Sequence, residues 1–130
     1  MNFTRRIELD CTYDEAIPRV KDALKEQGFG VLTEIDVRKT LKEKLDIDVE
    51  AQIILGACNP KLAHRALGVD PRIAALLPCN VVVRVENGRT VVEALDPKLM
   101  AEVTGNPALT PIAEEAGGLI QAALDALARS

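Results

Sequence analysis

The order of apolar and polar residues along the chain predicts five strands and two long helices. Residues 2–9 alternate between apolar and polar side chains, as in a half-buried strand, except that Arg5 falls on the apolar side. Residues 12–27 place apolar side chains three and four positions apart, as in a helix with one buried face. We expect further strands at 29–35, 51–57, 80–85 and 90–95, and a last helix at 111–128.

Local signals mark where several of these elements begin and end. Asn87-Gly88 predicts a tight hairpin between the last two strands, because both residues tolerate the positive φ angles that such a turn requires. Short helices are expected where a capping residue stands before an apolar stripe or a proline. Their predicted starts are Asp36, Asn59-Pro60, Asp70-Pro71 and Asp96-Pro97.

Two of these segments predict which side chains share a face. In the strand at 29–35, alternation places Phe29, Val31, Thr33 and Ile35 together. In the short helix after Asp96-Pro97, we expect Leu99, Met100 and Val103 to pack on one side.

The order of elements favours an α+β fold. A strand, a helix, four strands and a final helix, one pair of strands being a hairpin, indicate a mainly antiparallel five-stranded sheet that grips the long helices on one face. Alternating polarity in the first two strands indicates that the other face is solvated or covered by a partner.

Composition and charge disfavour several classes of function. The 130 residues are expected to form a single domain, 1–130. A net charge of −4 and an aromatic content of 2% disfavour nucleic-acid binding. No segment is long and apolar enough to predict a membrane span, and three cysteines without a secretory signal are typical of a reducing, cytoplasmic location.

Two cysteine–asparagine pairs are the strongest site candidates. Cys58-Asn59 lies between a predicted strand and a predicted helix start, and Cys79-Asn80 lies where the next strand begins. Free amide groups at a helix start bind anions and lower the pKa of a nearby thiol. The alternative is that these cysteines are small buried apolar residues.

Other polar residues join these pairs only as weaker candidates. Glu34 and Asp36 are two residues apart at a strand end and could be paired carboxylates, although a strand end followed by a helix cap is the favoured explanation. His64 follows Cys58 by six positions and is the one histidine of the chain. With Cys58 and Cys79 it makes a poor zinc pattern, so no metal or other cofactor is predicted.

Four segments resemble the family called domain of unknown function 302. They are Gly-Phe-Gly-Val-Leu-Thr-Glu-Ile-Asp-Val at 28–37, Ile-Leu-Gly-Ala-Cys-Asn-Pro at 54–60, Leu-Leu-Pro-Cys-Asn-Val-Val-Val at 76–83 and Asp-Pro-Lys-Leu-Met at 96–100. The resemblance covers roughly residues 7–105 and implies a helix-grip fold of the TATA-box-binding-protein type, often dimeric. It implies no function. Other branches of the family lack the two cysteines.

The residues together favour a dimeric module that binds or senses a small-molecule or anionic ligand. Its site is expected at Cys58, Asn59, Cys79 and Asn80, with Glu34, Asp36 and His64 as further candidates. One alternative is a thiol-dependent or redox enzyme that uses Cys58 and Cys79. Another is a homodimeric scaffold in which both turns are purely structural.

Overall fold

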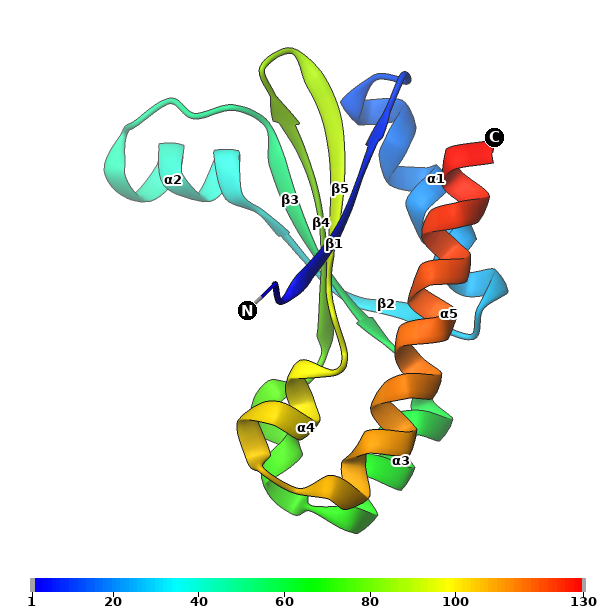
Figure 1. Ribbon diagram of the computed structural model, residues 1–130. Helices are drawn as coiled ribbons and strands as arrows, with labels where there is room; N and C mark the ends of the chain where they lie inside the picture. The colour runs from blue at the N-terminus through cyan, green and yellow to red at the C-terminus, as the bar shows by residue number, and fades with distance from the viewer. Residues whose placement is uncertain (1, 130) are drawn as a thin grey trace.

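The fold is a five-stranded antiparallel sheet with two long helices on one face, as the computed structural model shows for residues 2–129 (Figure 1). The strands lie in the order β1-β5-β4-β3-β2, and each pair of neighbours is antiparallel. The predicted α+β class is therefore confirmed. The strands are β1 (Thr4–Leu9), β2 (Gly30–Asp36), β3 (Gln52–Cys58), β4 (Cys79–Glu86) and β5 (Arg89–Leu95).

The helices occupy three places around the sheet (Figure 1). The long helices α1 and α5 cover one face, which we call the inner face. Helices α3 and α4, with the 3-10 helices η1 and η2, extend beyond one end of the sheet, whereas α2 projects from the opposite, outer face. The bounds are α1 (Tyr13–Glu26), α2 (Val37–Leu45), α3 (Pro60–Val69), η1 (Pro71–Leu76), α4 (Leu99–Thr104), η2 (Pro107–Leu109) and α5 (Thr110–Arg129).

Two apolar clusters hold these layers together. The larger lies between the inner face and helices α1 and α5, and includes Val20, Leu55 and Ile120. The smaller lies beyond the end of the sheet, where α3, η1 and α4 meet the first half of α5, and includes Ile73 and Leu109. Aliphatic side chains therefore supply most of the core, together with the buried Phe29.

The predicted turn and capping residues act as expected. Asn87 and Gly88 have φ angles of 52° and 76° and join β4 to β5. The side chains of Thr12, Asp36 and Asn59 each accept a hydrogen bond from a backbone N–H in the first turn of a helix. The α4 start differs from the prediction, because Asp96 accepts from the N–H of Lys98 and the helix begins only at Leu99.

The predicted alternation along β2 is wrong beyond its first residues. A break in the pairing register between Val31 and Thr33 inserts one residue into the strand. Val31 therefore faces the core with Phe29, whereas Ile35 lies directly opposite Ile54 on the outer face. Such a bulge reverses the faces of every residue that follows it.

The short helix α4 also buries fewer residues than predicted. Met100 is buried, whereas Val103 is 60% exposed, so the two do not share one packed face. Six residues make fewer than two turns, and only the side facing α5 and η1 is covered.

Arg5, the charged residue on the apolar side of β1, reaches α5. Its guanidinium donates to the carboxylate of Asp96 (Nε to Oδ2, 3.2 Å) and to the carbonyl of Gly117 (Nη1 to O, 3.1 Å). A Cβ atom on Gly117 would lie 3.0 Å from Nη2 of Arg5. Glycine at this position thus gives the arginine room against the helix backbone, whereas a Cβ on Gly118 would meet nothing within 4 Å.

Candidate functional site

Cys58 and Cys79 lie at the same end of neighbouring strands. Cys79 is directly opposite Ala57 in the antiparallel pairing of β3 and β4, and Cys58 is the next residue and the last of β3. Opposed Cα atoms are 4.5–5.5 Å apart and successive residues advance by about 3.4 Å, which puts the Cα atoms of Cys58 and Cys79 roughly 6 Å apart. The three cysteines, Cys11 included, are all free thiols.

Both cysteines line one small cavity beside the end of the sheet. The cavity has a volume of about 20 Å³ and lies among β3, β4, α3, α4 and α5. Most of its wall is apolar and much of it is small, with Ala57, Ala66 and Ala116 among the lining residues. A volume of this size has room for one water-sized occupant.

The two thiols have different environments. Cys79 is only 6% exposed, whereas Cys58 is half-buried. Burial raises the pKa of the Cys79 thiol to about 11, and the nearby Cys58 contributes to the rise through its charge. Cys79 is therefore a protonated thiol at neutral pH in the absence of a ligand, unlike the activated thiolates of redox enzymes.

The structure separates the two predicted asparagines. Asn59 caps α3, accepting from the N–H of Leu62 (Oδ1, 3.3 Å) and donating to the carbonyl of Gln27 (Nδ2, 3.5 Å). It lines the cavity, with its amide engaged in the fold. Asn80 is exposed and lines a hollow on the outer face, and it is not among the residues that line the cysteine cavity.

Glu34, Asp36 and His64 also lie away from the cavity. Asp36 pairs with Ile53 at the far end of β3, about 17 Å along the strand from Cys58. It caps α2, accepting from the N–H of Lys39, while Glu34 accepts from Nζ of Lys21 on α1 (2.9 Å). His64 is exposed on α3 and does not line the cavity. The expected grouping of these residues with the cysteines is not found.

Met100 is a lining residue that the sequence did not predict for the site. Met100 of α4 is 4% exposed and lines the cavity together with Cys58 and Cys79. The sequence indicated only that Met100 would pack on a helix face, and nothing in its neighbourhood signalled contact with residues some twenty or more positions earlier. Among residues 2–129, no group of three or more His, Cys, Asp and Glu side chains could hold a metal ion.

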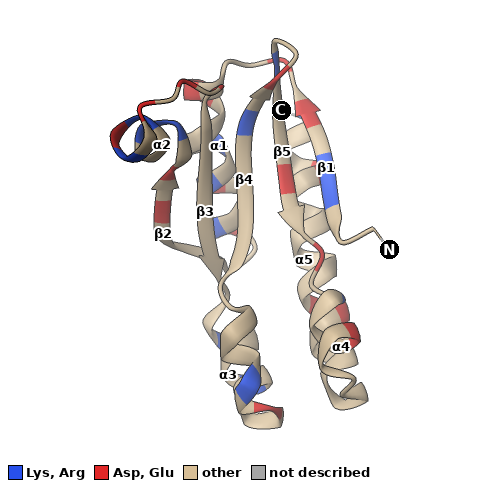
Figure 2. Cartoon of the chain, turned by 90° about the vertical axis from the view of Figure 1, so that its left-hand side faces the viewer, with Lys and Arg blue, Asp and Glu red and all other residues tan. Residues whose placement is uncertain are grey.

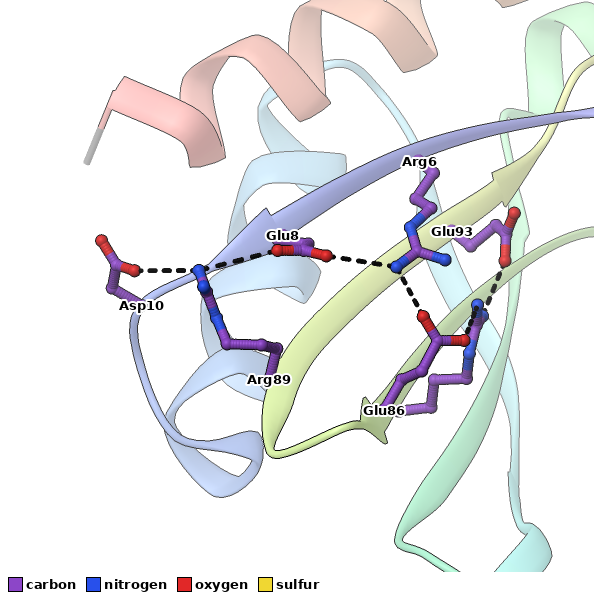
Figure 3. Close-up of polar contacts among 7 residues, drawn as sticks. Arg6, Glu8, Asp10, Glu86, Arg89 and Glu93 are labelled. Carbon is purple, nitrogen blue, oxygen red and sulfur yellow. Dashed lines mark hydrogen bonds and ion pairs between the residues drawn. The ribbon is translucent and has the colours of Figure 1, made fainter.

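The outer face contains a second concentration of polar groups. Figure 3 shows carboxylates and guanidiniums alternating from Asp10 through Arg89, Glu8 and Arg6 to Glu86. Arg84 continues the series to Glu86 and Glu93. Each charge has a partner of opposite sign, and the groups are largely in contact with water, so the network is better suited to solvation than to binding one charged ligand.

The chain is similar to one described sequence family and to a solved structure of that family. Residues 5–127 match the sequence family described as "Domain of unknown function DUF302". The fold is similar to the crystal structure of an uncharacterized conserved DUF302 protein from Bacillus stearothermophilus, with a TM-score of 0.92 and 33% sequence identity, covering 98% of this chain and 99% of that one. No curated protein matches the chain.

In the part of the chain that the structure describes, no helix is long and apolar enough to cross a membrane.

Proposed function

The chain belongs to the DUF302 family, and we propose that it is a binding or sensing module whose ligand occupies the cavity lined by Cys58 and Cys79. The observation that carries this proposal is that the two cysteines come from different strands and line the same cavity. Two cysteines at one small cavity indicate a binding site for a ligand that interacts with sulfur. Buried cysteines that were scattered through the core would be explained by packing alone.

The size and lining of the cavity limit the ligand. A volume of about 20 Å³ admits a single atom or a molecule the size of water, not an organic metabolite, unless α3 or α4 moves. The apolar wall disfavours an ionised carboxylate or phosphate, since burial of an unpaired charge is costly. The ligand that fits best is small and interacts favourably with sulfur.

The module is also proposed to work as a homodimer through its outer face. Ile35, Ile54 and Val82 lie directly opposite one another across β2, β3 and β4 on that face. Figure 2 shows that β3 carries no charged residue, while charges gather on β1, β4 and β5. This apolar row is left uncovered, with Ile35 49% exposed.

Helix α2 supplies the second half of that interface. None of its nine residues is buried, and it projects from the outer face (Figure 1). A helix this short is marginal without tertiary packing, so its apolar residues need a covering surface. Four basic residues and one acidic residue make α2 positive in a chain whose net charge is −4, which favours a second copy as the occupant. In a two-fold pair, α2 of each copy would cover the apolar row of the other.

Native mass spectrometry of protein purified under reducing conditions tests the ligand-binding proposal. We expect a bound mass that is retained by the folded protein and lost on denaturation. Ala63→Leu fills the cavity from a half-buried position on α3 and is expected to abolish that mass, whereas Ala75→Leu, at an exposed position of η1, should retain it. Retention of the same mass by Ala63→Leu, or no bound mass in the wild type, would contradict the proposal.

A further inference from the structure

Sulfur atoms are concentrated at this cavity. Residues 2–129 contain four sulfur-bearing side chains, Cys11, Cys58, Cys79 and Met100, and all but Cys11 line the same cavity. They come from the end of β3, the start of β4 and the helix α4. Three segments that are distant in the sequence thus contribute two cysteines and one methionine to the lining of a space that holds one water-sized occupant.

The cavity offers almost nothing but sulfur to a polar occupant. Asn59 is the one lining residue with a side-chain amide, and that amide already caps α3 and contacts the carbonyl of Gln27. A buried water needs two to four hydrogen-bonding partners, which the aliphatic wall does not supply. Hard cations such as Mg²⁺ and Ca²⁺ require several oxygen ligands, and Asn59 is the one lining residue with a side-chain oxygen.

We propose that the cavity binds a single Cu(I) ion through the sulfur atoms of Cys58 and Cys79, with the thioether of Met100 as a third ligand. Thiolate and thioether ligands select Cu(I) over the harder divalent ions. Zn²⁺ fits less well, because its sites are tetrahedral and use Cys, His or carboxylate ligands, while His64 lies exposed on the other side of α3. This inference rests on the proposed function, since it names the ligand of the same cavity.

Binding must account for the thiol protons. Coordination of Cu(I) by two thiolates releases two protons and leaves the site with a single negative charge. Helix α3 begins at Pro60, directly after Cys58 and Asn59, so the positive end of its dipole lies beside that charge. Because both thiols must lose their protons to bind Cu(I), the affinity should increase with pH.

An anaerobic titration tests the proposal. The reduced protein competes for Cu(I) with bathocuproine disulfonate, whose copper complex is coloured, and the loss of colour reports transfer to the protein. We expect one Cu(I) per chain for the wild type. Cys58→Ser removes a ligand and should weaken binding by more than about 100-fold. Changes to residues that only support the ligands typically weaken metal binding by about 10- to 100-fold. Met100→Leu preserves side-chain volume and should weaken it by about tenfold.

The third cysteine provides the matched control. Cys11 is half-buried, as Cys58 is, but does not line the cavity, so Cys11→Ser should bind Cu(I) as the wild type does. Wild-type protein that takes no Cu(I) from the chelator, or binding that depends on Cys11 as strongly as on Cys58, would overturn the Cu(I) proposal. If the wild type fails to bind Cu(I) but native mass spectra show another mass that Ala63→Leu abolishes, only the metal inference is wrong. If neither is found, the proposed function is wrong as well.

Discussion

Cys58 lies one residue beyond the position directly opposite Cys79 in the pairing of β3 with β4, and both residues line one cavity. The antiparallel pairing is what produces this juxtaposition, since the end of β3 meets the start of β4. In parallel strands the same two residues would lie at opposite ends, about 17–20 Å apart. Helix α3, which follows β3, contributes Leu62, Ala63 and Ala66 to the wall of the cavity.

The buried thiol of Cys79 should make the protein less stable at alkaline pH. Its pKa is raised from the ordinary value of 9.0 to about 11, so between these values the unfolded chain loses a proton that the folded chain keeps. The unfolded state then binds fewer protons, and the free energy of unfolding falls as the pH rises through this window. The loss attributable to Cys79 is at most about 3 kcal/mol.

Urea denaturation at several pH values between 8 and about 11 measures that contribution. Cys79→Ala should remove the part of the decline that is due to this thiol. If the free energy of unfolding falls equally steeply with pH in the wild type and in Cys79→Ala, burial does not raise the pKa of Cys79.

The two adjacent glycines of α5 should respond differently to alanine. Gly118→Ala adds a Cβ in open space and improves helix propensity, so it should stabilise the protein by roughly 1 kcal/mol. Gly117→Ala should gain clearly less or lose stability, because its Cβ would push the Arg5 guanidinium from the carbonyl that it contacts. The midpoints of urea unfolding compare the variants, and equal gains would refute the role of Gly117 in accommodating Arg5.

Gly56 is expected to be intolerant of any side chain. A Cβ there would lie 2.8 Å from Cγ of Pro78 and overlap the hydroxyl oxygen of Thr33. Gly56→Ala should therefore cost about 1–3 kcal/mol of stability or more. Thr33→Ala in the same chain should recover part of this loss, leaving the contact with Pro78.

Gly30 is the matched control for Gly56, because it also lies in a strand and a Cβ there would meet nothing within 4 Å. Gly30→Ala should change thermal stability little. If Gly56→Ala unfolds at the same temperature as Gly30→Ala, Gly56 is not in close contact with Thr33 and Pro78.

The proposed dimer predicts that a charge in the apolar row separates the subunits. Ile35→Glu places a carboxylate in the middle of the buried contact and should shift the protein from dimer to monomer at micromolar concentration. Val103→Glu, at a 60% exposed position of α4, should leave the dimer intact. Light scattering after gel filtration gives the masses, and a monomeric wild type would rule the dimer out.

Much of the fold was predictable because its signals are local. The hairpin at Asn87-Gly88 and the caps at Thr12, Asp36 and Asn59 depend on residues within a turn of one another. The β2 bulge has no such signal, and its cause is the pairing with β3. Sequence reasoning consequently placed Ile35 on the wrong face.

The candidate site was predictable only in part. The order of the strands correctly brought Cys58 and Cys79 to one end of the sheet, but alternation alone already required Asn80 to face away from Cys79. Met100 reaches the cavity through the packing of α4 against α5 and η1, a tertiary contact that local periodicity does not encode.

An anomalous difference map of crystals soaked with Ag(I), a soft ion chemically similar to Cu(I), tests most directly whether Cys58, Cys79 and Met100 form one site. The account predicts a single strong peak within bonding distance of the sulfur atoms of Cys58 and Cys79, on the side of Met100. Silver bound to Cys11 alone, or separate peaks at Cys58 and Cys79 with no shared ion, would contradict it.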